Sequence, residues 1–259
     1  MKTVLLSDLT NAAKNSTFHL SDQKTQHVRK VLRMEWGESL NITDGAGKLY
    51  RGSLEKSGDR ASVKIDEVVK SHDKPLDSEL VIGLSKNNTM DWLVEKAVEC
   101  GVTRILPIVM SRSVVKTNAK DASKYSERWQ SIMDGAVEQS ERLWRPIVEH
   151  PQGWSDWLKS SDQQVNVAKQ YKRIGFFSEL RSNPSFSEHE SLASTWKALQ
   201  NYKTAPIQVF IGPEGGFADT EREQLIKLGF EAHSLGETVL RVETAVIAAL
   251  TLIKFSRLL

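Results

Sequence analysis

Two short glycine-containing segments carry the residues whose types and spacing suggest chemistry. The first, IGPEGGFADTE, spans residues 211–221 and follows the apolar run Ile207–Ile211. The second, LGETVLRVETA, spans residues 235–245 and leads into a run of small and apolar residues. Glycine is unfavourable in an ordered segment unless the backbone needs unusual dihedral angles or a close approach. Each segment therefore predicts a loop between a strand and a helix, where backbone amides can hold a small molecule.

The first loop matches neither of the common phosphate-binding patterns. A phosphate loop needs G-x-x-x-x-G-K-[ST], and no lysine with a neighbouring hydroxyl follows these glycines. The dinucleotide fingerprint needs G-x-G-x-x-G, whereas Pro213 and Glu214 occupy the middle of this loop. A helix should begin directly after it, because Thr220 and Glu223 have the spacing of a capping box. Taken alone, the segment favours a tight turn that binds nothing.

Arg241 in the second loop lies between two apolar residues, directly before the predicted helix Glu243–Arg257. Packing does not require a charge there, although a weak surface ion pair with Glu243 or Glu237 is the ordinary explanation. Both loops follow apolar strands, and open α/β sheets bind ligands at the carboxyl ends of their strands. The pair could bracket a flat heterocycle such as adenine, and neither loop offers a lysine for a triphosphate.

The bulk composition is that of an ordinary soluble globular protein. The chain has 259 residues, 39% of them hydrophobic and 26% charged, which is enough for two domains. We expect no secretory signal and no membrane span, because the apolar runs are short. Cys100 is the single cysteine and the six histidines have no metal-ligand spacing with it. These features predict a cytoplasmic protein without disulfides or metal.

Positive charge is slightly concentrated in the first part of the chain. Residues 1–74 contain 13 Lys and Arg against 10 Asp and Glu, while the remainder contains 22 against 23. The most basic stretch is KTQHVRKVLR at 24–33, where Lys24, Arg29, Lys30 and Arg33 could neutralise phosphates. A basic amphipathic helix is more often a solvated face.

The pattern of elements changes near residue 74. Before it, 39–56 predicts a hairpin turning at Asp44-Gly45, 60–70 another strand, and Ser21–Met34 a helix. A polar linker follows at 70–78. After it, strands and helices alternate, which predicts a mostly parallel α/β sheet covered on both faces. The expected strands are 80–84, 104–109, 146–149, 174–177, 207–211 and 231–235, and the expected helices are 91–100, 124–143, 192–199 and 243–257.

The two loops, in this order, closely resemble the C-terminal signature of the bacterial RsmE family. Its members use S-adenosylmethionine to methylate N3 of a uridine in 16S ribosomal RNA. Residues 27–52 resemble the family's N-terminal barrel, and residues 84–116 and 128–148 resemble its middle blocks. This sequence departs from the family at Asn87-Asn88, at Cys100, and at Ala218, which replaces a helix-capping serine.

The resemblance implies a SPOUT methyltransferase fold. Residues 1–74 would form a PUA-like RNA-binding domain, and residues 75–259 an α/β domain with a deep trefoil knot, a topology that is otherwise rare. It also implies a homodimer. The implied S-adenosylmethionine cradle is Phe177, Ser178, Glu179, Ile211, Gly212, Pro213, Glu214, Gly215, Gly216, Leu235, Gly236, Val239, Leu240 and Arg241.

Methylation at N3 requires that the uracil lose a proton, or that its developing anion be stabilised through an oxygen. Arg241 is a candidate for this stabilisation. Glu138 and Arg142 have the i,i+4 spacing of a weak surface salt bridge, but the resemblance makes them catalytic candidates. Arg112 is similarly a candidate for an RNA phosphate or base, and no general base is identified.

Two other functions remain open at this point. A non-enzymatic RNA-binding factor for ribosome assembly could keep the fold, although both glycine loops and Arg241 are intact. A SPOUT enzyme acting on another RNA, or on a ribose 2′-hydroxyl, is disfavoured because the barrel precedes the α/β domain and because of the residues in the two loops.

Overall fold

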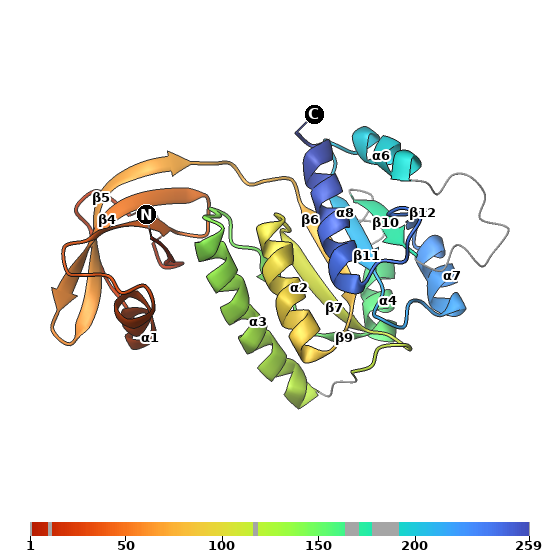
Figure 1. The fold of residues 1–259 in the computed structure, drawn as a ribbon, viewed down its shortest axis with the longest axis horizontal. Helices are drawn as coiled ribbons and strands as arrows, with labels where there is room; N and C mark the ends of the chain where they lie inside the picture. The colour runs from red at the N-terminus through yellow and green to blue at the C-terminus, as the bar shows by residue number, and fades with distance from the viewer. Residues whose placement is uncertain (1, 10–11, 116–118, 164–170, 178–191, 259) are drawn as a thin grey trace. The chain divides into compact units, whose positions relative to one another are not determined.

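The computed structural model describes residues 2–9, 12–115, 119–163, 171–177 and 192–258. The chain divides into two compact units (Figure 1). One contains residues 1–75 and 134–145, and the other contains residues 76–133 and 146–259. Compactness alone does not define a domain, so the division at residue 74 stays a prediction.

A five-stranded sheet forms the first unit, with strand order β1-β3-β4-β5-β2. Its β1 pairs parallel to β3, and the other pairs are antiparallel. Alternating residues such as Leu40, Ile42 and Leu54 enter one core cluster, as period-two patterning requires. The strands are β1 Thr3–Leu5, β2 Thr17–His19, β3 Ser39–Thr43, β4 Lys48–Ser57 and β5 Arg60–Ser71.

The predicted hairpin is confirmed as the pair β3 and β4. Asp44 follows β3, and its Oδ1 accepts hydrogen bonds from the backbone nitrogens of Ala46 (2.7 Å) and Lys48 (3.0 Å). An aspartate that bonds to its own turn in this way is a common turn former. The sequence signal and the side-chain chemistry therefore agree.

The basic segment is helical, but it is not one regular α-helix. Helix α1, Asp22–Gln26, begins at Ser21, whose Oγ accepts a hydrogen bond from Lys24 N (3.2 Å). A π-helical turn continues from it over His27–Val31. The helix expected over 21–34 is thus correctly located, although it widens into π geometry and ends at Val31.

Among the described residues, the second unit is built on seven parallel strands, with six in the order β12-β10-β11-β6-β7-β8 and β9 beside β7. They are β6 Ser78–Gly83, β7 Arg104–Val109, β8 Ile147–Val148, β9 Gln152–Gly153, β10 Lys172–Phe176, β11 Ile207–Ile211 and β12 Glu231–His233. The helices are α2 Asn87–Glu99, α3 Ala119–Gln139, α4 Trp154–Gln163, α6 Leu192–Asn201, α7 Asp219–Lys227 and α8 Val242–Ser256.

Helices cover both faces of the parallel sheet, as the alternating pattern predicted. Helix α8 packs against α2 and β11, and Figure 1 shows α2 and α8 in front of the strands. On the other face, the Phe210 ring of β11 meets Trp157 of α4 at 5.2 Å and Phe230 at 5.9 Å between ring centroids. The α/β fold with a preceding β-rich unit is therefore confirmed. The trefoil knot stays a prediction.

The long helix α3 differs from its predicted bounds at both ends. It begins at Ala119 rather than Lys124 and ends at Gln139 rather than Leu143. Arg142 N donates to Val137 O (3.1 Å) and Glu141 N to Glu138 O (3.4 Å), the two bonds of a Schellman cap. Glu141 takes the left-handed position with φ of 54°, where glycine is usual. Because no glycine stands at this end, the residue types alone do not mark where the helix stops.

The described part of the chain contains no helix long and apolar enough to cross a membrane.

Candidate active site

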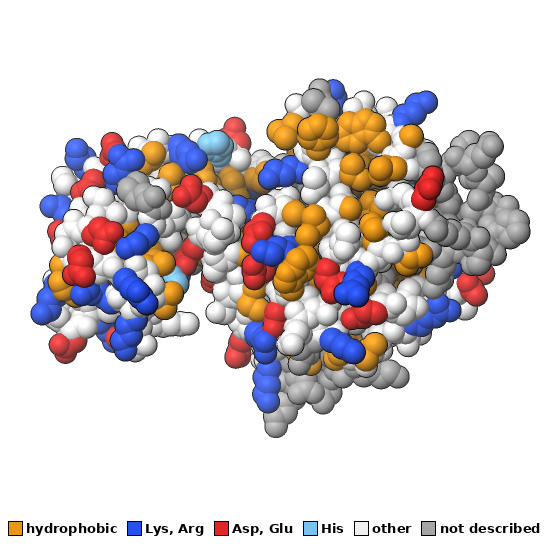
Figure 2. Space-filling view, viewed as in Figure 1, with side chains coloured by type: hydrophobic (Ala, Val, Ile, Leu, Met, Phe, Trp, Pro, Cys, Tyr) orange, Lys and Arg blue, Asp and Glu red, His pale blue; other side chains and the backbone are white. Residues whose placement is uncertain are grey.

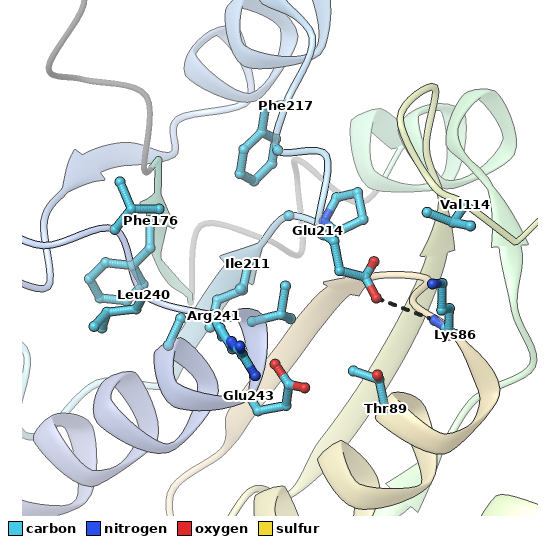
Figure 3. Close-up of a pocket in the computed structure, with 16 residues that line it drawn as sticks. Lys86, Thr89, Val114, Phe176, Ile211, Glu214, Phe217, Leu240, Arg241 and Glu243 are labelled. Atoms are coloured by element: carbon cyan, nitrogen blue, oxygen red, sulfur yellow. Dashed lines mark hydrogen bonds between the residues drawn. The ribbon is translucent and has the colours of Figure 1, made fainter.

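A cavity of about 520 Å³ opens at the carboxyl ends of β6, β10 and β11 (Figure 3). This volume lies in the range of small-molecule and cofactor sites. Its wall is made by Lys86 and Thr89 after β6, Val114 after β7, Phe176 at the end of β10, the loop after β11, and the loop that leads into α8. Parallel strands thus bring five separate segments to one edge of the sheet.

The loop after β11 is packed so tightly that a side chain larger than that of glycine would clash with its neighbours. A Cβ atom on Gly215 would lie 2.8 Å from the carbonyl oxygen of Arg112. A Cβ atom on Gly83, at the end of β6, would lie 2.3 Å from the nitrogen of Pro213. Real side chains essentially never approach so closely. The backbone of 212–216 is therefore held between the segments that follow β6 and β7.

Helix α7 starts two residues earlier than the predicted capping box. Its N-cap is Ala218, which cannot cap through its side chain, and Glu221 replaces Glu223 as the reaching carboxylate. Glu221 accepts from Ala218 N (2.9 Å) and from Ser111 N (2.8 Å). The T-x-x-E spacing was misleading because the capping carboxylate is buried. It takes the position where the backbone nitrogens of Ala218 and Ser111 can both donate to it, and that position is 221. Glu221 ties the loop after β7 to the start of α7.

The second loop is held from the side by α6. The Thr195 hydroxyl donates to Ser234 O (2.8 Å) and accepts from Ser234 N (3.3 Å). The Ser234 hydroxyl in turn accepts from Gly236 N (3.2 Å) and donates to Gly236 O (3.0 Å). Gly236 has φ of +118°, a conformation that side chains rarely adopt. These bonds fix the chain as it turns from β12 toward the cavity.

Arg241 is the N-cap residue of α8 and lies on the cavity wall. Its carbonyl oxygen accepts the first bond of the helix, from Ala245 N (2.9 Å), and its side chain makes no capping bond. Among the described residues the guanidinium has no ion pair, so the surface pair with Glu243 or Glu237 is not formed. Figure 3 shows Arg241 and Glu243 side by side on one wall. The donor fork of Arg241 is thus left free for a ligand.

The cavity combines apolar walls with convergent polar groups. Phe176, Ile211 and Leu240 supply apolar surface, while Glu214 faces Lys86, whose backbone nitrogen donates to it at 3.5 Å (Figure 3). Such a lining suits a heterocycle with a charged tail. The described residues contain no group of three or more His, Cys, Asp or Glu placed to hold a metal.

Comparisons with known proteins agree with this geometry. A family model described as an RNA methyltransferase domain matches residues 72–254, and one described as an RNA methyltransferase PUA domain matches residues 20–66. The chain is 30% identical over 242 residues to the ribosomal RNA small subunit methyltransferase E of Mesomycoplasma hyopneumoniae, covering 93% of this chain and 95% of the relative.

The chain belongs to the RsmE family of RNA methyltransferases.

Solved structures of similar proteins share its fold. The ribosomal RNA small subunit methyltransferase E of Neisseria gonorrhoeae, bound to S-adenosyl methionine, superposes with a TM-score of 0.79 at 28% identity, covering 98% of this chain and 97% of the other. A Legionella pneumophila protein solved with bound SAM gives a TM-score of 0.81 at 30% identity, with the same coverage.

Most residues carried over from the RsmE signature surround the cavity. Eight of the predicted cradle residues lie on its wall: Ile211, Gly212, Pro213, Glu214, Gly216, Val239, Leu240 and Arg241. Gly215, Leu235 and Gly236 belong to the same loops but do not line it. Phe177 packs instead in the core against Phe217, with 4.8 Å between ring centroids. Ser178 and Glu179 lie outside the described residues.

The sequence interpretation missed several residues of the wall. Phe176, the neighbour of the predicted Phe177, is on the wall because successive strand residues face opposite sides. The others are Lys86, Thr89, Val114, Phe217, Val242, Glu243 and Ala245. Lys86 and Thr89 follow the carboxyl end of β6, so the rule that pointed to the two loops also pointed to them.

Glu138, predicted to contact substrate, sits among residues of the first unit. It is 9% exposed, and its Oε1 accepts from Leu5 N (2.9 Å) and from Lys24 Nζ (2.5 Å). His27 Nε2 lies 3.1 Å from its other carboxylate oxygen. A buried carboxylate needs such partners, and these contacts tie the end of α3 to β1 and α1. A catalytic role for Glu138 stays a prediction.

Arg142 also belongs to the first unit, directly after the left-handed Glu141. Burial lowers the pKa of Arg142 to about 10, so its guanidinium stays charged at neutral pH. Neither Glu138 nor Arg142 lines the cavity around Arg241. Glu138, considered as one half of an i,i+4 salt bridge with Arg142, forms an ion pair with Lys24.

The predicted RNA-binding residues differ in their exposure and in their contacts. Lys24 is engaged with Glu138, whereas Lys30 and Arg33 are exposed. Arg29 is half-buried and packs on the Trp36 ring. Arg112, in the other unit, donates to Gly215 O (3.3 Å), which places it against the first glycine loop rather than on the cavity wall.

Proposed function

We propose that this chain transfers a methyl group from S-adenosylmethionine to N3 of a uridine in 16S ribosomal RNA. The observation that carries the proposal is the Arg241 guanidinium, which has no ion pair among the described residues and lies on the wall of a cavity built from both signature loops. Membership of the RsmE family supports it, as do relatives named ribosomal RNA small subunit methyltransferase E. The non-enzymatic alternative would need neither feature.

The volume and the lining of the cavity suit the cofactor. The backbone of 211–216 and 239–241 would hydrogen-bond the adenine edges, with Leu240 and Ile211 against the ring. The close approach at Gly215 keeps this backbone free of side chains. S-adenosylmethionine, when bound, supplies an electrophilic methyl group. Alignment is then the main task of the protein.

The remaining chemistry belongs to side chains on the wall. Uracil N3 must lose its proton to become a good nucleophile, and the negative charge then spreads to O2 and O4. Arg241 would donate to one of these oxygens and stabilise that charge. Glu214 and Glu243 are the carboxylates on the wall, within the described residues, that can accept the proton.

The RNA would be held mainly by the first unit. Its sequence carries more positive than negative charge, and Figure 2 shows Lys and Arg side chains spread over the visible face of this unit. N3 is blocked in a base pair, so the target uridine must be splayed out. The family resemblance supports a homodimer that works in the cytoplasm on the small subunit or an assembly intermediate.

Mass spectrometry of 16S ribosomal RNA tests the proposal directly. Cells that lack this protein should lose one N3-methylated uridine, and the purified protein with S-adenosylmethionine should restore it. If 16S RNA keeps its full methylation in cells that lack the protein, while the purified protein binds the cofactor in calorimetry, the substrate is another RNA. Absence of cofactor binding would favour the non-enzymatic factor.

Three basic residues of the segment 24–33 should govern the ionic part of RNA binding. Neutralising Arg29, Lys30 and Arg33 together should weaken binding of 16S RNA and reduce the slope of log K against log salt by roughly 2 to 3, about 0.7 to 0.9 for each phosphate contact. Lys24→Ala should have a smaller effect on the slope, because its ammonium is paired with Glu138. An unchanged slope in the triple variant would exclude phosphate contacts there.

A further inference from the structure

Trp36 is an exposed aromatic side chain in the basic part of the first unit. Its relative exposure is 40%, although tryptophan is normally well covered in folded proteins. It follows the basic segment 24–33 within three residues, and Lys30, Val31 and Arg33 of that segment are also exposed. An exposed indole is thus close in sequence to exposed positive charge.

The indole is held in place by Arg29. The guanidinium carbon of Arg29 lies 4.3 Å from the Trp36 ring centroid, a cation–π contact. Arg29 also donates to Met34 O and lies 3.8 Å from a Glu35 carboxylate oxygen. Three contacts fix this arginine, so one face of the indole has a rigid cationic backing and the exposed part of the ring is oriented.

The backbone around this pair has two unusual features. His27–Val31 is a π-helical turn, and Arg33 adopts φ of 50°, the left-handed region. Both are uncommon for ordinary residues and are found more often at functional sites. The chain then turns back so that Met34 N donates to Val28 O (3.0 Å). This geometry brings Trp36 back over Arg29.

We propose that an unpaired nucleobase of the RNA substrate stacks on the exposed face of Trp36. The inference rests on the proposed function, since it takes ribosomal RNA as the partner. Base stacking on an aromatic ring needs an exposed, oriented π face beside cations that follow the phosphates. Trp36 is backed by Arg29 and is close in sequence to the exposed Lys30 and Arg33, so it offers this combination. A duplex offers no free base face, so the surface selects unpaired RNA.

The test uses the full-length protein with single-stranded oligouridylate and with a fully paired RNA duplex of equal length. Trp36→Ala should weaken oligouridylate binding roughly 5- to 150-fold, the range expected for one base–aromatic stack. Trp36→Phe, which keeps a ring, should lie between. Val68→Ala removes an exposed apolar side chain elsewhere in the same unit and should bind like the parent.

The salt dependence separates stacking from charge. Trp36→Ala should leave the slope of log K against log salt unchanged, whereas Lys30→Ala with Arg33→Ala should reduce it by roughly 1.4. Oligouridylate should quench parental tryptophan fluorescence, and this quenching should be lost in Trp36→Phe but kept in Trp92→Phe. The paired duplex should not quench the tryptophan fluorescence of the parent or of either variant.

Two results would overturn the inference. Parental affinity of Trp36→Ala for oligouridylate would show that no base stacks there. A reduced salt slope in Trp36→Ala would show that the indole acts only by positioning Arg29. Methylation of 16S RNA, assayed on the same preparations, reports on the proposed function separately, because the binding comparison does not require catalysis.

Discussion

Replacing Arg241 by alanine is expected to lower the single-turnover rate of RNA methylation by about 10²- to 10³-fold, the usual effect of removing one oriented donor to a developing oxyanion. The guanidinium lies on the cavity wall without an ion pair among the described residues, so its hydrogen-bonding capacity is available to a ligand. Because Arg241 is exposed, the free energy of unfolding should change by no more than about 0.5 kcal/mol.

Arg241→Lys separates charge from geometry. Lysine keeps the positive charge but loses the planar fork, so its rate should lie between those of the alanine variant and the parent. Calorimetry with S-adenosylmethionine then assigns the contact. An unchanged cofactor affinity indicates the uracil oxygen, and a matching loss of affinity indicates the cofactor carboxylate.

A second arginine provides the control for Arg241. Arg128 is also exposed, lies in the same unit and pairs with Asp91. Arg128→Ala should methylate at the parental rate. If Arg241→Ala did the same, Arg241 would be a solvated cap of α8 with no part in the reaction.

The sequence was most informative where a local pattern has one structural explanation. The hairpin at Asp44 was predictable because a turn residue stood between alternating strands, and the parallel sheet was predictable from the alternation of strands and helices. The cavity followed from one general rule, that ligands bind at the carboxyl ends of parallel strands. Once both loops were assigned to strand ends, their convergence was expected.

The sequence was least informative where a side chain is satisfied by a distant partner. Glu138 looked like half of a surface salt bridge with Arg142, but it is bound by Lys24 and by the backbone of Leu5, more than 100 positions away. Glu221 took the capping role predicted for Glu223 because it also reaches Ser111. The partners of these carboxylates depend on which polar groups the fold brings together, and residue spacing along the chain does not predict them.

Gly215→Val is expected to reduce the affinity for S-adenosylmethionine by roughly 5- to 150-fold, because forcing an added side chain into a packed region costs about 1 to 3 kcal/mol. A Cβ atom at this position would lie 2.8 Å from Arg112 O and 2.9 Å from Arg112 Cβ. The loop cannot simply retreat, because Pro213 already fills the space beside Gly83. The residues on either side, Glu214 and Gly216, would therefore shift on the cavity wall.

Three further glycine variants test this explanation. Gly215→Ala adds only the Cβ and should lose less affinity than the valine variant. Gly236→Val should also weaken binding, but through backbone strain at φ of +118°, since its Cβ would meet no atom within 4 Å. Gly135→Ala, on α3 where a Cβ meets open space, should leave cofactor affinity unchanged and stabilise the fold by about 1 kcal/mol.

The binding calorimetry of Gly215→Val can be interpreted only if the variant unfolds in one cooperative transition, which shows that it is folded. The clash is confined to the loops after β7 and β11, and the strands themselves keep their pairing, so we expect one thermal transition close to the parental temperature. Loss of binding in a cooperatively folded protein then shows that the loop backbone holds the cofactor. Parental affinity in cooperatively folded Gly215→Val would exclude the first loop as the holder of the cofactor, and parental affinity in Gly236→Val as well would mean that the cofactor binds elsewhere.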